Sequence, residues 1–239
     1  MKALILAAGP GKRLKAQTKE HNKCMFSVFG KPLIEHSLIT AASLKEIDEI
    51  IIVVGHMAEQ IINAYGTKYQ DKTVKYRIQS PLKGPVGAIE AALLDLESED
   101  FLLLFGSELV VQGRYQEMIK DFYHHKLSVS CGVVPASEKV PYSVIQDEKG
   151  FIYRLVEKPA RLVNKWMGTG SCVFQSSALE YSASVPVHPV ARERTLPDLI
   201  QTAVDNGHPV KSFNLGNDYV SINTKEDLDA LEKPVTFYQ

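Results

Sequence analysis

The first 33 residues constrain the fold of this chain more than any other stretch. An apolar run over residues 3–6 predicts a buried β-strand, and this run breaks at the sequence AAGPG, positions 7–11. Small residues let a phosphate approach the backbone, where free N–H groups can point at it. Arg13 and Lys23 follow and supply positive charge for a polyphosphate. The stretch therefore predicts a strand followed by a phosphate-binding loop, although glycine motifs this short also occur in ordinary turns.

Strand-like and helix-like segments alternate through the rest of the first half. Further strands are predicted over residues 47–54, 74–78 and 101–105, and helices over residues 32–42, 57–65 and 87–97. This alternation is typical of a doubly wound α/β sheet with parallel strands. Ligands of such sheets bind at the carboxyl ends of the strands. We therefore expect the loops at residues 7–13, 79–84 and 106–108 to line one crevice.

The second half of the chain has shorter strands separated by turn residues. Strands are predicted over residues 128–134, 142–146, 151–156, 167–174 and 210–214, and helices over residues 115–125, 195–206 and 224–231. This mixture predicts antiparallel additions to the same sheet. Because no linker-like stretch separates the halves, we expect a single domain over residues 1–239, with residues 185–194 as its most flexible excursion.

Charge, cysteine content and hydropathy exclude several classes of protein. A net charge of −1 gives no polybasic surface for nucleic acid or membrane. The three cysteines are far apart and fit neither a metal-binding spacing nor a disulfide framework, so a reducing cytoplasm is the expected compartment. The apolar N-terminus is interrupted early by glycine and proline, so neither a signal peptide nor a membrane span is expected.

Several short motifs, taken in order, resemble those of the sugar-phosphate nucleotidyltransferases, also called nucleotide-sugar pyrophosphorylases. The resemblance covers nearly the whole chain, and the order of the motifs makes it specific. The motifs are LAAGPGKRL at positions 6–14, Lys23, GKP at 30–32, Gln79 with Gly84, Gly106 after an apolar strand, EKP at 157–159, GTG at 168–170 and INTKEDL at 222–228.

The resemblance implies a Rossmann-like three-layer α/β/α nucleotidyltransferase fold, with a mostly parallel central sheet and antiparallel additions in the second half. It implies transfer of a nucleoside monophosphate from an NTP to a sugar 1-phosphate or similar phosphate acceptor, with release of pyrophosphate. Residues 1–110 would form the nucleotide-binding half and residues 111–239 the acceptor-binding half. Such chemistry depends mostly on positioning and on neutralising charge.

The resemblance also assigns roles to individual residues. As catalytic residues, Arg13 would hold the leaving phosphates, Lys23 the α-phosphate and Lys158 the acceptor phosphate. The nucleotide-binding residues would be Leu6, Ala7, Ala8, Gly9, Gly11, Lys12, Gln79 and Gly84. The acceptor-binding residues would be Ser143, Glu157, Lys158 and Gly170. Gln79 can bond the edge of a pyrimidine or a purine, so it does not fix the base.

The expected cofactor is Mg²⁺, which needs hard oxygen ligands and usually takes one or two carboxylates together with phosphates. Relatives carry an aspartate after the central strand where this chain has Ser107, and Glu108 follows it. The second ligand of relatives falls at Ser221 in some and at Asn223 in others. We therefore expect Glu108 and Asn223 to hold the metal, provided that the loop turns Glu108 back towards the crevice, since successive strand residues face opposite sides.

Two functions remain open from the sequence. The first is an active nucleotidyltransferase that binds an NTP and a sugar phosphate or other small phosphorylated acceptor, alone or as a homodimer. The second is a catalytically weak or inactive relative that binds the same ligands as a regulatory or partner subunit. A dinucleotide-binding protein is not expected, because Leu14 stands where G-x-G-x-x-G needs glycine and Asp48 lies too far along for the ribose.

Overall fold

A computed structural model describes residues 1–11, 13–14, 20–96, 98–110, 113–136, 142–161 and 163–229. At its centre β1 (Lys2–Ala7) runs parallel to β4 (Glu49–Val54) on one side and to β7 (Phe101–Phe105) on the other. Beyond β4 the sheet continues with the parallel strand β6 (Lys72–Ile78) and the short antiparallel β5 (Lys68–Tyr69). The strand predicted at residues 3–6 is thus the middle of the sheet, with both faces covered, as its unbroken apolar run requires.

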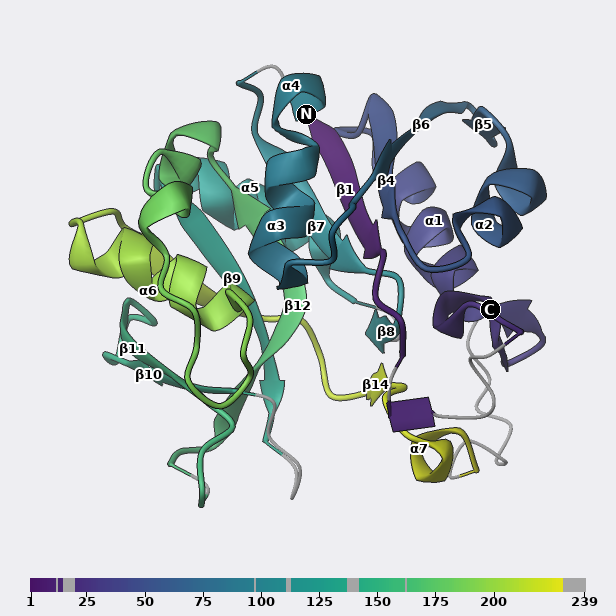
Figure 1. The fold of residues 1–239 in the computed structure, drawn as a ribbon. Coiled ribbons are helices and arrows are strands. Elements are labelled where there is room, and N and C mark those ends of the chain that lie inside the picture. Colours follow the sequence, from purple (N-terminus) through teal and green to yellow (C-terminus); the bar gives the residue numbers. More distant parts are fainter. Residues whose placement is uncertain are drawn as a thin grey trace.

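The second half extends the same ten-stranded sheet from β7 (Figure 1). The long strand β12 (Trp166–Phe174) pairs antiparallel with β7 and with β9 (Val129–Pro135). The sheet is completed by β10 (Tyr142–Gln146), β11 (Ile152–Glu157) and β13 (Val210–Asn214). The predicted antiparallel additions are therefore confirmed.

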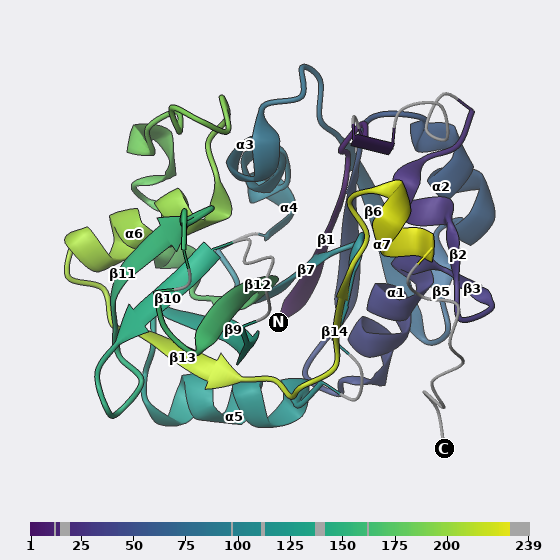
Figure 2. The ribbon, with the colours of Figure 1, turned by 90° about the horizontal axis from the view of Figure 1, so that it is seen from below.

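Helices cover both faces of the sheet. One face packs against α3 (Gly84–Ala91), α4 (Leu93–Leu96) and α6 (Leu196–Asp205). The other packs against α1 (Leu33–Ser43), α2 (Ala58–Tyr65) and α5 (Tyr115–His124). Figure 2, seen from below, shows this layering around the central strands. Two apolar cores, one on each side of the sheet, result, and the three-layer α/β/α prediction is confirmed.

A small ribbon stands apart from the main sheet. The strand β8 (Glu108–Val110) pairs antiparallel with β14 (Tyr219–Ser221), so that Glu108 lies opposite Ser221. A second ribbon joins β2 (Ser27–Val28) to β3 (Lys31–Pro32). Neither ribbon was predicted, because strands of two or three residues are too short to show a period. The first ribbon carries the C-terminal residues back beside the central strand.

Two helix predictions differ from the structure. The helix expected over residues 87–97 begins at Gly84, three residues earlier, and is interrupted at Ala92. Pro85 favours the earlier start because its fixed φ suits the first turn of a helix. The helix expected over residues 224–231 is α7 (Lys225–Asp229) in the described residues, and hydrogen bonds between Thr224 and Asp227 cap its start. None of the described helices is long and apolar enough to cross a membrane.

Candidate active site

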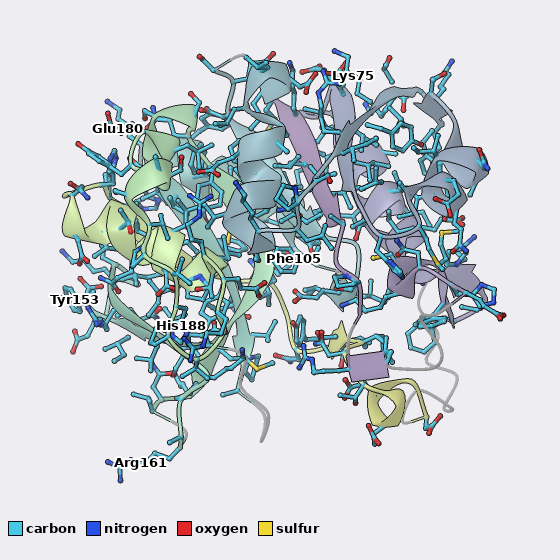
Figure 3. All side chains as sticks on the ribbon, in the orientation of Figure 1. Lys75, Phe105, Tyr153, Arg161, Glu180 and His188 are labelled. Carbon is cyan, nitrogen blue, oxygen red and sulfur yellow. The ribbon has the colours of Figure 1, made fainter. Side chains whose placement is uncertain are left out.

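A cavity of about 680 Å³ opens at the carboxyl ends of the central strands. Phe105, at the end of β7 and labelled in Figure 3, is one of the residues that line it. Residues from the N-terminal loop, the centre and the C-terminal segment contribute to the lining. They include Arg13, Lys23, Ser107, Glu108, Tyr142, Glu157, Lys158, Gly168, Gly170, Glu193, Thr195, Tyr219, Ser221, Asn223 and Asp227. The structure thus brings together seven of the predicted site residues from both halves of the chain: Arg13, Lys23, Glu108, Glu157, Lys158, Gly170 and Asn223.

Lys23 is positioned by a short 3-10 helix, η2 (Lys23–Met25). The preceding residue, Asn22, is fully buried and caps this helix, because its side chain accepts a hydrogen bond of 2.8 Å from the N–H of Cys24. The Asn22 amide also donates to the carbonyl of His56, and its backbone N–H donates to Gln60. These bonds fasten the cation-bearing segment to the loop after β4 and to α2.

The charge of Lys23 faces the C-terminal segment. Its Nζ lies 3.5 Å from Oδ1 of Asn223. Burial lowers the pKa of Lys23, while the charge of Glu108 acts to raise it. A cation held in a partly desolvated position interacts strongly with any anion that enters the cavity. Lys23 is therefore placed to bind a phosphate.

Glu108 points into the cavity because the chain turns just before it. Gly106 and Ser107 form a turn, and the N–H of Gly106 bonds to the carbonyl of Leu6. The Glu108 carboxylate accepts a hydrogen bond of 2.7 Å from the N–H of Gly170 on β12. Burial raises the pKa of Glu108, and this hydrogen bond and Lys23 oppose the effect. The loop thus turns Glu108 towards the cavity, as its expected role as a metal ligand requires.

The oxygens around Glu108 form a set that a hard cation can use. Asn223 donates from Nδ2 to Ser221 Oγ at 2.7 Å, which turns its Oδ1 the other way, towards Lys23. One carboxylate and one amide oxygen thus border the same cavity. Among the described residues no group of three or more His, Cys, Asp or Glu side chains could hold a metal. The donor set fits Mg²⁺ of the kind that completes its shell with phosphates and water.

Glu157 and Lys158 lie where β11 ends. Lys158 Nζ is 3.5 Å from Glu157 Oε1, and burial raises the pKa of Glu157. Lys158 has φ +44°, a left-handed conformation that a side-chain-bearing residue seldom adopts. Strained residues of this kind cluster at functional sites. The conformation supports a functional role for Lys158 over a solvated turn.

Two glycines of β12 allow close packing in the cavity wall. A Cβ on Gly168 would lie 1.9 Å from the ring of Tyr142, and one on Gly170 would lie 2.8 Å from Glu108 Oε2. The Tyr142 hydroxyl donates a bond of 2.6 Å to the carbonyl of Thr169. Gly168 is therefore required here, because the ring of Tyr142 occupies the space that any side chain would need.

Other predicted site residues lie outside the lining of this cavity. Leu6 and Ala7 belong to β1 and Ala8 is buried, whereas Gly9 is exposed and Gly11 has φ +60°. Lys12 lies outside the described residues. We expected residues 79–84 to line the crevice, but none of them lines this cavity. The nearest lining residue in the sequence is Pro85.

Gln79 and Ser143 are turned towards protein partners. The side-chain amide of Gln79 donates to the carbonyl of Gly84 at 2.9 Å. Ser143 is fully buried, and its hydroxyl donates to Asn164 at 3.4 Å. Their predicted binding roles stay predictions.

Two features that shape the site were not predicted from the sequence. Asn22 looks like an ordinary loop asparagine, and its capping role follows only from the fold. Glu193 belongs to the segment 185–194, which was expected to be a flexible excursion, yet it lines the cavity together with Thr195. Helix α6 begins at this wall, with Thr195 as its N-cap.

The arrangement can bind a polyanion and a hydroxyl-bearing group together. Three cations, Arg13, Lys23 and Lys158, come from distant parts of the chain and border one cavity. Carboxylates border the same cavity, and these can accept hydrogen bonds from hydroxyl groups. Such a site suits phosphate chemistry, in which positioning and charge neutralisation do most of the work.

The family model described as nucleotidyl transferase matches residues 2–219. The bifunctional protein GlmU of Bacillus subtilis (strain 168) is 26% identical over 243 residues, which cover 97% of this chain and 51% of that protein. The UTP–glucose-1-phosphate uridylyltransferase AglF of Haloferax volcanii is 27% identical over 240 residues, covering 98% of this chain and 96% of that protein. The chain thus spans about half the length of some of these relatives and nearly all of another.

Solved structures share the fold at lower identity. A UDP-glucose pyrophosphorylase complexed with UDP-glucose superposes with a TM-score of 0.84 at 18% identity, covering 96% of both chains. The inositol-1-phosphate CTP transferase of T. maritima superposes with a TM-score of 0.77 at 22% identity, covering 97% of this chain and 93% of that one.

Proposed function

This chain belongs to the nucleotidyl transferase family, and from that membership we propose that it transfers a nucleoside monophosphate from an NTP to a sugar 1-phosphate, releasing pyrophosphate. One observation carries the proposal: Lys158 of the second half borders the same cavity as Arg13 and Lys23 of the first. A protein that bound one phosphate group would have little use for cations from both halves. Among the named relatives, AglF is a UTP–glucose-1-phosphate uridylyltransferase.

In this proposal each half of the chain binds one substrate. Residues 1–110 bind the NTP, with Arg13 on the departing phosphates and Lys23 on the α-phosphate. Residues 111–239 bind the acceptor, with Lys158 on its phosphate and Glu157 on a hydroxyl. The acceptor oxygen then attacks the α-phosphorus in line, and the fixed cations stabilise the charge that builds in the transition state.

We also propose Mg²⁺ as the cofactor, held by Glu108 and Asn223 together with substrate phosphates. When bound, the ion would neutralise charge on the triphosphate. The support is the donor set: both residues border the cavity and both offer hard oxygens. The ribbon of β8 and β14 holds the two segments in register, since Glu108 pairs with Ser221 two residues before Asn223.

Location and assembly are further parts of the proposal. Cys24, Cys131 and Cys172 are free thiols, which supports a reducing cytoplasm. A homodimer is proposed as the assembly, and light scattering coupled to size exclusion would test it. The net charge of −1, with no basic excess, supports small-molecule substrates over nucleic acid.

The deciding experiment is a panel of ATP, CTP, GTP, UTP and dTTP against glucose 1-phosphate and other phosphorylated acceptors. Pyrophosphate is measured with Mg²⁺ and with EDTA. Release that requires one NTP, one acceptor and the metal supports the enzyme. A thermal shift with NTP but no pyrophosphate for any pair would instead identify the protein as a binding relative.

A further inference from the structure

Four carboxylates line the cavity, and three of them have protein partners. Glu108 accepts from the N–H of Gly170, and Glu157 pairs with Lys158. Asp227 accepts from the N–H groups of Asn223 and Thr224. The carboxylate of Glu193 makes no hydrogen bond or ion pair with any residue in the described ranges. Its acceptor capacity is therefore available to a ligand.

The backbone that carries Glu193 is firmly held. Its carbonyl accepts a 2.9 Å bond from the N–H of His188, and the His188 carbonyl accepts one of 2.8 Å from the N–H of Arg192. The ring nitrogen Nδ1 of His188 accepts from the N–H groups of Val190 and Ala191. Figure 3 labels His188 on this loop below α6. The segment expected to be flexible is thus a hydrogen-bonded turn.

The next residue, Arg194, fastens the turn to helix α3. The guanidinium of Arg194 bonds both carboxylate oxygens of Glu90 on α3, one of them at 2.8 Å, and also the carbonyl of Ser182. The Arg194 carbonyl accepts from the N–H of Val86. A planar guanidinium bound in this two-pronged way fixes orientation as well as distance. Glu193 therefore sits on a rigid wall.

Glu193 lies against the start of α3. A Cβ built on Gly84 would be 2.8 Å from Glu193 Cβ and 3.1 Å from its Cδ. The wall continues through Thr195, Leu196 and Pro197, which also line the cavity. Glu193 thus borders the cavity between the start of α3 and the start of α6.

The chemistry of a carboxylate restricts what it can bind there. An ionised carboxylate accepts hydrogen bonds and cannot donate them. Phosphate groups of a substrate are anionic near neutral pH and would be repelled by it. The proposed substrates carry two kinds of group that can donate to it, the hydroxyls of their sugars and the N–H groups of the base.

We propose that Glu193 is a substrate-binding residue that accepts a hydrogen bond from a sugar hydroxyl, either of the nucleotide ribose or of the acceptor. This inference rests on the proposed nucleotidyltransferase function. Glu193 then contributes to the choice of substrate, and the Glu90–Arg194 pair positions it.

The test compares Glu193→Ala and Glu193→Gln with wild-type protein. Glu148→Gln, an exposed acid on the turn between β10 and β11, is the matched control. We expect the alanine variant to raise KM for one substrate by about tenfold to a hundredfold, the range for a hydrogen bond to a charged group, with kcat nearly unchanged. The glutamine variant keeps an oxygen acceptor and should lose less.

Two arms distinguish the sources of the hydroxyl. If the ribose is bound, replacing UTP, or whichever ribonucleotide is active, by its 2′- or 3′-deoxy form weakens binding to the wild type but not to Glu193→Ala. If the acceptor is bound, KM for glucose 1-phosphate or the active acceptor rises while KM for the nucleotide stays constant. Unchanged KM values for both substrates in both variants would overturn the inference.

Calorimetric titration with each NTP and with glucose 1-phosphate separates this inference from the proposed function. Binding does not require turnover, so a protein that releases no pyrophosphate still reports on Glu193. Equal dissociation constants in wild type and Glu193→Ala for every ligand that binds would overturn the role of Glu193 alone.

Discussion

The ammonium nitrogen of Lys23 lies 3.5 Å from Oδ1 of Asn223, although 200 residues of sequence separate them. The contact joins the loop after the first strand to the segment after β14. Both residues border the cavity that also contains Arg13 and Lys158. The geometry therefore unites the proposed phosphate-binding and metal-binding groups at one place.

Removing a cation from this cluster tests the assigned chemistry. We expect Arg13→Ala and Lys23→Ala each to lower the rate of pyrophosphate release by about 10²–10³, the cost of removing one group that stabilises transition-state charge. The fold should remain intact, because neither side chain belongs to the two apolar cores. Lys149→Ala, on an exposed turn, serves as the control. Wild-type turnover in either cavity variant would refute the assignment.

A second carboxylate should strengthen the proposed metal site. Ser107 lines the cavity next to Glu108, and the family resemblance implies an aspartate at its position. We expect Ser107→Asp to lower the Mg²⁺ concentration needed for half-maximal activity by roughly tenfold, the order by which a change near a metal alters its affinity. A titration of activity with Mg²⁺ measures this. No change would indicate that Glu108 already supplies the charge.

The close approach of Tyr142 to Gly168 predicts a strict requirement for glycine. Gly168→Ala places a methyl group 1.9 Å from the Tyr142 ring and should reduce the free energy of unfolding by about 1–3 kcal/mol, the usual cost of overpacking. Gly9→Ala is the control, because its Cβ would meet no atom within 4 Å. Urea denaturation measures both. Equal midpoints would show that the strand adjusts without strain.

The Glu90–Arg194 pair lends itself to a double-mutant cycle. The two side chains are largely buried, with 27% and 17% of their surfaces exposed. We expect Glu90→Gln and Arg194→Met each to destabilise the protein, and the double variant to lose less than the sum, with a coupling of roughly 0.5–3 kcal/mol. The singles should also raise KM for the substrate that Glu193 binds. If the losses of stability in the two single variants simply add in the double variant, the Glu90–Arg194 pair does not stabilise this part of the cavity wall.

The burial of His36 leads us to expect that the stability of the protein depends on pH. It is 1% exposed on α1, with Nε2 2.9 Å from the carbonyl of Val28. Burial lowers the pKa of His36 and Lys31 lowers it further, and together they outweigh the Val28 hydrogen bond and the charge of Glu35, which raise it. The unfolded chain therefore takes up a proton at higher pH than the folded protein does. The free energy of unfolding should fall as the pH drops through about 6.5 towards the folded-state pKa.

The variant His36→Gln isolates this effect, because it keeps a donor for Val28 and does not titrate. Denaturation curves recorded between pH 7.5 and 5 should show a shallower loss of stability in the variant than in the wild type. Parallel curves would contradict the assignment to His36.

The central strands could be predicted because each is an apolar run with both faces buried, and this pattern leaves little alternative. The ribbon of β8 and β14 could not be predicted. Its strands have three residues each, and Glu108 pairs with Ser221, more than a hundred residues away. Local periodicity carries no information about such a pairing. This ribbon brings Asn223 close to Glu108. The sequence therefore predicted both residues as metal ligands but not the strand pairing that brings them together.

The motifs predicted the residues of the candidate site better than the general rule that ligands bind at the carboxyl ends of parallel strands. Arg13, Lys23, Glu157 and Lys158 were named from motifs and all line the cavity. The rule that ligands bind at the carboxyl ends of the strands also predicted that residues 79–84 line the cavity. In the structure the side-chain amide of Gln79 instead donates a hydrogen bond to the carbonyl of Gly84. Glu193 was missed because it has no motif, and its place depends on how Arg194 docks on α3.

The position of β1 in the middle of the sheet has a consequence for how the protein is made. Its neighbours β4 and β7 are complete by residue 105, so a growing polypeptide can form the central strands early. The segment with Asn223 and Asp227 emerges from the ribosome about 120 residues later, on the order of ten seconds at usual synthesis rates. For an interval, therefore, the central strands of each nascent molecule can fold while the cavity still lacks the wall that Asn223 and Asp227 provide.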